Sequence, residues 1–266
     1  MKRTYLILLI AMIVVLTVSA QAQYSRIKNI VNSSHDMSST STTAGPKAVS
    51  NTQICYYCHS PHPETNNSDP LVTADQGGQN PLWNHYLSTK ASYGVYSSPS
   101  FDAFGTDIAD VGGAVAGSAA VTNLCLSCHD GTVGVNTLYK GQYVNGSGRV
   151  SPNFGSGNSA PVFIPASSGA VIGGGTEGLS NMHPLNFTYD ATLAGKSVSL
   201  VVPTTASNGF GGTRTGLNTS GGKFLPLFAN KMQCATCHDV HDGTTYRPFL
   251  RASTTGSELC LACHGK

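Results

Sequence analysis

All eight cysteines of this 266-residue chain stand in one repeated pattern, in which two cysteines three positions apart are followed directly by a histidine. The four copies occupy residues 55–59, 125–129, 234–238 and 260–264, and no cysteine is left over. Side chains three positions apart lie on the same side of a helical turn, so each copy brings two thiols and an imidazole together. Any fold of this chain must be built around four such points.

The C-x-x-C-H pattern matches the attachment site of c-type haem, in which two thiols form thioethers and the histidine binds the iron as proximal ligand. Zinc sites and disulfides are the structural alternatives, but neither needs a histidine after every cysteine pair. We therefore predict four covalently bound haem c groups. The predicted attachment residues are Cys55, Cys58, Cys125, Cys128, Cys234, Cys237, Cys260 and Cys263, and the proximal iron ligands are His59, His129, His238 and His264.

Further histidines are available as distal iron ligands, and these are His35, His62, His85, His183 and His241. Imidazole suits iron, so histidine alone can complete all four sites with one residue to spare. Methionine ranks second, because Met182 directly precedes His183 and Met37 lies two residues after His35. We expect four bis-histidine haems, with the surplus histidine left open.

His62 and His241 each follow a proximal histidine by three residues. Both imidazoles of such a pair lie on one side of a helical turn, so they cannot bind opposite faces of the same haem. The second histidine therefore binds a different haem, which brings two macrocycles into near contact, or it hydrogen-bonds a propionate. Pro61 can end the helix early and loosen this constraint for His62.

The N-terminus has the pattern of a secretory signal. Lys2 and Arg3 precede an apolar run over residues 5–18, and small residues spaced A-x-A follow at 20–22. The run is shorter than the roughly 20 apolar residues of a membrane span. We expect residues 1–22 to be cleaved and the mature protein to be exported without a membrane span. The net charge of +2 comes from this segment, so the mature chain has no basic stripe for nucleic acid.

Residues 23–266 are interpreted as a single four-haem cytochrome domain. Haems 1 and 2 are assigned to residues 23–140, a glycine-rich wrapping segment to 141–222, and haems 3 and 4 to 223–266. About 60 residues for each haem cannot enclose much apolar core, so the macrocycles must supply part of the interior. We predict a multihaem cytochrome c with little regular secondary structure: short helices at the haem motifs, and loops and a few short strands around a row of four haems.

Within the wrapping segment, residues 197–202 alternate weakly in hydropathy and are predicted to form a strand, as are residues 162–164. A short hairpin is expected there, with His183 projecting inward.

Several segments resemble one family. They are residues 34–37 (SHDM), 54–63 (ICYYCHSPHP), 81–85 (PLWNH), 124–133 (LCLSCHDGTV), 183–187 (HPLNF), 233–241 (QCATCHDVH) and 259–264 (LCLACH). With these motifs the chain resembles exported c-type cytochromes with doubled C-x-x-C-H units, and among them the four-haem OmcE-type group of extracellular cytochrome filaments. The resemblance implies bis-histidine haems in a continuous chain, with one distal histidine crossing between subunits.

We accordingly predict extracellular electron transfer by a tetrahaem cytochrome that is not an enzyme. Copies of the chain would polymerise head to tail into a conductive filament and pass electrons to other redox proteins or external acceptors. The ligand supplied in trans is predicted to be His62, with His35 as second choice. The alternatives are a monomeric periplasmic tetrahaem carrier and a multihaem reductase, which needs one haem with an open sixth position.

Overall fold

The computed structural model describes residues 29–59, 83–88, 90, 92–103, 120–138, 143–145, 148–150, 160–173, 178–207, 212–243 and 245–265. The predicted signal at residues 1–22 and the predicted ligand His62 lie outside these residues. Within the described ranges, none of the helices combines the length and the apolar character needed to cross a bilayer.

Each C-x-x-C-H motif begins on a short helix, as predicted, and the motif at residues 125–129 lies wholly within its helix. Motif 1 lies on the 3-10 helix η1 (Ile54–Tyr57), motif 2 on α3 (Ala120–His129), motif 3 on α5 (Cys234–Cys237) and motif 4 on α6 (Glu258–Leu261), which follows the 3-10 turn η4 (Thr255–Ser257). A capping box starts α5, because the Gln233 side chain accepts from a backbone N–H of the first turn and the Gln233 N–H donates to Thr236 Oγ1.

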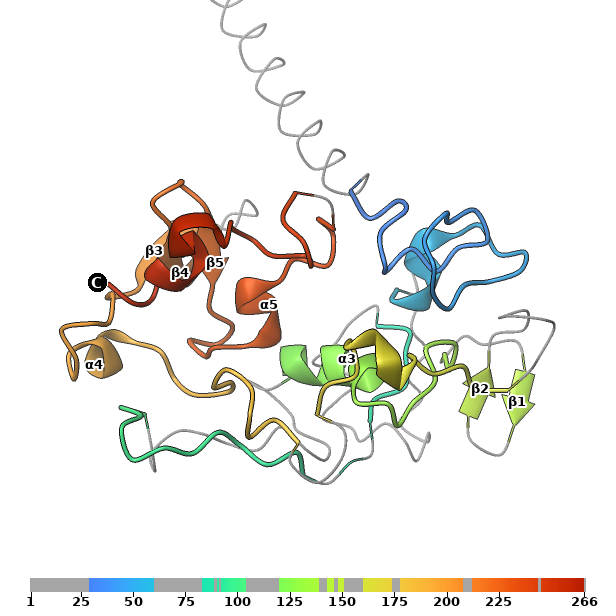
Figure 1. Ribbon diagram of the computed structural model, residues 1–266, viewed down its shortest axis with the longest axis horizontal. Helices are drawn as coiled ribbons and strands as arrows, with labels where there is room; N and C mark the ends of the chain where they lie inside the picture. Colours follow the sequence, from blue (N-terminus) through green and yellow to red (C-terminus); the bar gives the residue numbers. More distant parts are fainter. Residues whose placement is uncertain are drawn as a thin grey trace, which may run out of the picture.

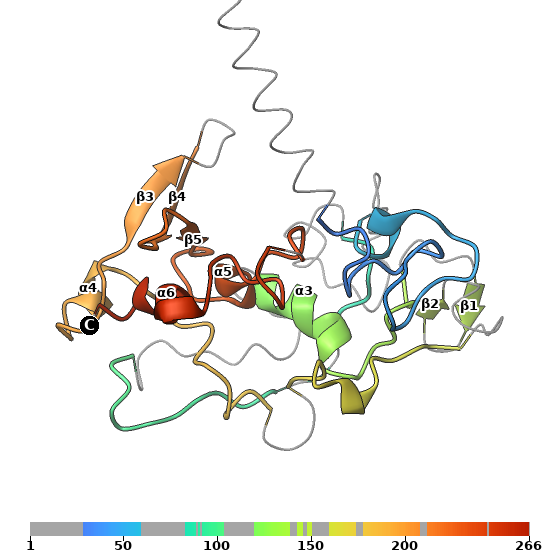
Figure 2. The ribbon, with the colours of Figure 1, turned by 45° about the horizontal axis from the view of Figure 1, so that its top comes forward.

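The four motif helices follow one another across the molecule in chain order (Figure 1). From the N-terminal segment drawn in blue, the order runs through η1, α3 and α5 to α6 beside the C-terminus, and the second view keeps the same order (Figure 2). The arrangement therefore provides a row of attachment points.

The centre of this row is a buried polar contact between α3 and α5. Gln233, which is fully buried, accepts hydrogen bonds through Oε1 from both the N–H and the hydroxyl of Thr122. Its amide nitrogen donates to Asn186 Oδ1 at 3.2 Å. One amide side chain thus joins motif 2, motif 3 and the segment that follows His183.

The strands are few and short. Strands β1 (Tyr143–Asn145) and β2 (Gly148–Val150) form an antiparallel hairpin. Strands β3 (Thr204–Ser207), β4 (Thr213–Asn218) and β5 (Phe224–Pro226) form an antiparallel sheet in the order β3-β4-β5. The remaining short elements are the 3-10 helix η3 (Ala166–Ser168) and α4 (Ala191–Ala194), which is capped by the Asp190 side chain. The prediction of little regular secondary structure is confirmed.

The buried apolar residues fall into three clusters, each beside a motif. The largest packs β4 and β5 against the motif 4 region through Phe187, Leu217, Leu225 and Ala262. A second surrounds Tyr57 of motif 1, and a third holds Leu126 of motif 2. No single core dominates the described residues, as expected of a chain with several attachment points.

Both strand predictions in the glycine-rich segment are wrong. Residues 197–202 form a turn in which Ser197 accepts from Ser199 N–H through its hydroxyl and from Leu200 N–H through its carbonyl. This local bonding competes with a strand ladder, and only a single bridge joins Leu200 to His264. Residues 162–164 also form no strand, because Val162 N–H donates to the Asn136 side chain.

Gly178 lies where its loop crosses closely over the backbone of Tyr93, and a substitution there can test this crossing. Its φ is +56°, and a Cβ there would overlap the carbonyl oxygen of Tyr93, to which Leu179 N–H donates at 2.8 Å. We predict that Gly178→Ala lowers the free energy of unfolding of the haem-loaded protein by about 3 kcal/mol. Denaturant unfolding followed by circular dichroism measures this.

The matched control is Gly169→Ala. Gly169 also has a positive φ, +68°, but a Cβ there would meet nothing within 4 Å. The free energy of unfolding of Gly169→Ala should fall only by the cost of placing alanine in the left-handed conformation, about 1 to 2 kcal/mol. Equal losses in both variants would contradict the close crossing at Tyr93.

Candidate functional site

The cysteines of consecutive motifs lie beside one another. The thiols of Cys125 in motif 2 and Cys234 in motif 3 are close enough for each to shift the pKa of the other. The neighbouring pairs Cys58 with Cys128, and Cys237 with Cys260, are close enough for electrostatic repulsion to raise a pKa. Groups attached to these thiols would therefore follow one another in the order of the chain.

Burial keeps most of these thiols protonated. It raises the pKa of Cys58, Cys128 and Cys263 to about 12, and the pKa of Cys237 to about 11. All eight cysteines are among the described residues, and none of them is joined to another in a disulfide. Every thiol is thus available for a thioether bond.

Two proximal histidines are oriented by backbone carbonyls. His129 Nδ1 lies 2.7 Å from the Ala170 oxygen, and His238 Nδ1 lies 3.0 Å from the Pro248 oxygen. An imidazole that donates through Nδ1 keeps its Nε2 lone pair for a metal, which is the usual outer-shell arrangement of metal-binding histidines. Both rings are therefore prepared to bind iron through Nε2.

Two of the predicted distal ligands also have Nδ1 beside a backbone carbonyl, but the Nε2 of His85 lies 2.9 Å from a second carbonyl oxygen, that of Gly134. His85 Nδ1 lies 2.7 Å from the Tyr86 oxygen, and His183 Nδ1 lies 3.0 Å from the Pro184 oxygen. Their positions differ, because His85 is fully buried whereas His183 is exposed. The prediction that His183 projects inward is wrong: a turn in which Met182 N–H donates to the Leu179 oxygen leaves the ring outside.

His85 lies where motifs 1 and 2 meet. Its neighbour Asn84 donates from the backbone to the Cys58 oxygen and from the side chain to the Tyr56 oxygen. The His85 Nε2 lies 3.4 Å from Cys128 Sγ. Burial lowers the pKa of His85, so the ring is neutral, as a metal ligand must be.

Two pairs of histidine rings have the spacing that a shared iron requires. A metal–imidazole bond is about 2 Å long and the ring centroid lies about 1 Å behind the nitrogen, so centroids on opposite sides of one metal are about 6 Å apart. The His59 and His241 centroids are 6.2 Å apart, with an interplanar angle of 11°. The His35 and His129 centroids are 5.9 Å apart, with an angle of 63°. Each pair joins a proximal histidine to a predicted distal one.

His35 is neutral within a group of histidines. Its ring stacks on Phe249 with centroids 4.3 Å apart. Burial, followed by the positive charges of His129, His238 and His241, lowers the pKa of His35 to about 4. Histidines that are far apart in the sequence therefore gather at one place.

The residues present fit covalently bound haem. Besides free thiols and paired imidazoles, Trp83 Nε1 and Thr137 Oγ1 are buried without a hydrogen-bond partner within the described part of the chain. Such donors suit the propionates that each haem carries, and the Trp83 ring lies 6.4 Å from that of His59. In the same ranges no three Cys, His, Asp or Glu side chains converge as a direct metal site.

The predicted second-choice ligands, the methionines, contribute differently. Met37 packs against the cluster at motif 1, and Met182 is exposed. The sequence analysis assigned no role to Trp83 and Asp239, which contact predicted ligands, or to Arg251, which pairs with Asp239. Trp83 and Asp239 had a sequence signal, because they stand in the segments PLWNH and CHDVH beside histidines, whereas Arg251 had none.

Comparison with known proteins bears on the C-terminal part of the chain. A protein-family model described as the doubled CXXCH motif matches residues 227–266, which contain motifs 3 and 4. No curated protein matches the chain. The doubled motif indicates covalently bound haem c, and it points to a multihaem c-type cytochrome that transfers electrons.

Proposed function

We propose that this chain is a four-haem, bis-histidine cytochrome that passes electrons along a row of haems and catalyses no reaction. The observation that carries the proposal is that cysteines of consecutive motifs adjoin in chain order, while two proximal histidines have a second histidine at the spacing of a shared iron. Haem iron supplies a one-electron couple. The thiols hold each haem in place, and paired imidazoles keep other molecules from the iron.

Haem 1 is assigned the axial pair His59 and His241, and haem 2 the pair His129 and His35. His241 then belongs to motif 3 by its backbone and to haem 1 by its ring, which is the link expected when two histidines lie three residues apart. His35 acts within its own chain in this assignment. His62 and His183 remain for haems 3 and 4, since His85 lies where motifs 1 and 2 meet.

The protein is further proposed to be exported and to polymerise head to tail into a filament that carries electrons to external acceptors. The resemblance to OmcE-type cytochromes supports this. Motif 4 lies near one end of the row (Figure 1), and Val198, Val202 and Leu261 near it are exposed apolar side chains. A second copy that covers them would bring its first haem near the last haem of the chain. His62 is the first candidate for the ligand in trans.

Filled axial positions separate a conduit from a reductase. We predict that the oxidised holoprotein gives only low-spin EPR signals, and that carbon monoxide leaves the optical spectrum of the reduced protein unchanged, because no iron has an open position. A stoichiometric high-spin signal together with carbon monoxide binding would favour the reductase.

The axial assignment predicts the effects of two glycine substitutions. His241→Gly and His35→Gly should each convert one of the four haems to high spin, and the double variant should convert two, since the histidines serve different irons. Added imidazole should restore the low-spin spectrum, which distinguishes a lost ligand from misfolding. Low-spin spectra in both single variants would refute the assignment.

Assembly can be tested by electron microscopy of purified His62→Ala and His35→Ala proteins. We expect His62→Ala to lose filaments, because its ring is the proposed link between subunits. His35→Ala should still form filaments, with one high-spin haem in each subunit. Wild-type protein that stays monomeric at high concentration would instead support the periplasmic carrier.

A further inference from the structure

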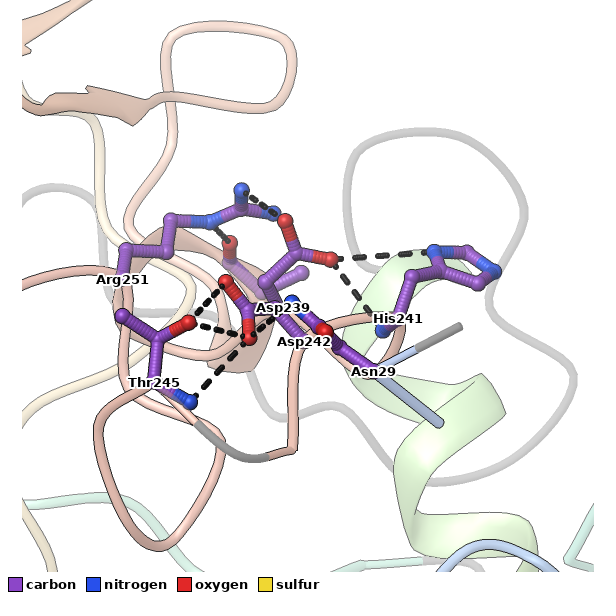
Figure 3. A network of polar contacts seen from close by, with 7 residues as sticks. Asn29, Asp239, His241, Asp242, Thr245 and Arg251 are labelled. Carbon is purple, nitrogen blue, oxygen red and sulfur yellow. Dashed lines mark hydrogen bonds and ion pairs between the residues drawn. The ribbon is translucent and has the colours of Figure 1, made fainter. Parts of the chain in front are cut away.

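A network around Asp239 joins the residues after motif 3 to the loop that follows (Figure 3). The Arg251 Nη1 donates to Asp239 Oδ2 at 3.0 Å, and Arg251 Nε donates to the Ala235 oxygen at 2.8 Å. The Asp239 N–H donates to the Phe249 oxygen, and Arg251 N–H donates to the Cys237 oxygen. The carboxylate is therefore fixed against motif 3 from several directions.

The other carboxylate oxygen faces His241. Asp239 Oδ1 accepts from the His241 N–H at 3.2 Å and lies 3.6 Å from His241 Nδ1. The Asp239 side chain is only 8% exposed, whereas that of His241 is 49% exposed. Figure 3 shows Nδ1 turned toward Asp239 and the second ring nitrogen turned away from it. One oxygen atom thus accepts from the His241 backbone and faces the ring nitrogen Nδ1 at a distance longer than a hydrogen bond, while the second ring nitrogen is turned away from it.

This environment differs from that of the other oriented histidines. The Nδ1 atoms of His85, His129, His183 and His238 each face a neutral backbone carbonyl. His241 faces a buried carboxylate instead. A motif comparison sharpens the difference: Asp130 follows His129 as Asp239 follows His238, but its carboxylate accepts from the hydroxyls of Tyr93, Thr132 and Ser88.

The electrostatic consequence follows from the charge change at iron. Reduction of a ferric haem adds one electron, so a nearby negative charge stabilises the oxidised form. Burial weakens solvent screening of the Asp239 charge. Arg251 pairs with the carboxylate on its opposite side from the imidazole (Figure 3). Outer-shell partners of this kind orient metal ligands and increase their basicity.

We propose that Asp239 is a positioning residue that holds His241 as an axial ligand and lowers the reduction potential of the haem that His241 binds. The inference rests on the proposed bis-histidine function and assigns to one haem an axial imidazole that faces a carboxylate, whereas the His35 ring stacks on Phe249 and the His129 Nδ1 faces the Ala170 oxygen. That haem would then be reduced less readily than its neighbour, so the reduction potential would change from one haem to the next within the row.

The test is Asp239→Asn in the haem-loaded protein, since asparagine keeps the size and an oxygen for Arg251 but removes the charge. A spectroelectrochemical titration should show one of the four midpoints rising by about 59 mV, a tenfold change in the equilibrium constant of a one-electron couple. The other three midpoints should stay in place, and all haems should remain low-spin.

Asp242→Asn is the matched control. It removes the same charge one residue after His241, but the Asp242 carboxylate accepts from Asn29 and Thr245. The midpoint shift in Asp242→Asn should be clearly smaller than the shift in Asp239→Asn. Equal shifts in both variants, or four unchanged midpoints in Asp239→Asn, would overturn the inference.

Two further measurements keep the outcome decisive. If Asp239→Asn fails to load haem, the wild-type midpoint that disappears in His241→Gly must be more negative than the one that disappears in His35→Gly; the reverse order would overturn the inference. If His241→Gly leaves all haems low-spin, the axial assignment itself fails. A high-spin haem in His241→Gly, with no shift in Asp239→Asn, refutes the role of Asp239 alone.

Discussion

The buried amide of Gln233 holds the two halves of this chain together. Through Thr122 it fastens α3 to α5, and through Asn186 it reaches the segment after His183. A buried polar group with partners on every side is costly to disturb, because each lost bond leaves an unpaired atom in a medium of low polarity. The contact between Cys125 and Cys234, and with it the order of motifs 2 and 3, depends on this junction.

Near this junction, the surroundings of several histidines keep their imidazole rings neutral and fix the direction in which the ring nitrogens point. Burial lowers the pKa of His35, His85 and His238, and carbonyl oxygens fix the rings of His85 and His238 through Nδ1. A metal ligand must be deprotonated at the binding nitrogen, and burial favours this neutral form. The carbonyl contacts raise the pKa of both rings, but burial is the larger effect, so the carbonyls mainly decide which nitrogen carries the proton. His241 differs from these residues because its Nδ1 faces the charged carboxylate of Asp239 and not a neutral backbone carbonyl.

Local sequence patterns predicted the helices at the motifs well, but they predicted poorly where other segments and side chains lie in the fold. The motifs were expected on short helices and lie on them, because the spacing of two cysteines and a histidine is a property of one turn. The strand expected at residues 197–202 is a turn, since the Ser197 side chain and carbonyl bind the backbone that a ladder would have used. His183 lies outside for a similar reason, a turn that weak hydropathy patterns do not encode.

The sequence by itself determined the number of C-x-x-C-H motifs, the residues that are candidates for binding iron and the scarcity of regular structure, because each depends on residue types and short spacings. Which histidine meets which was decided only by the tertiary structure. His59 and His241, or His35 and His129, are brought to within about 6 Å across long stretches of chain by contacts that no local pattern records. The same holds for Asp239, whose neighbour Arg251 reaches it only because the loop between them folds back onto motif 3.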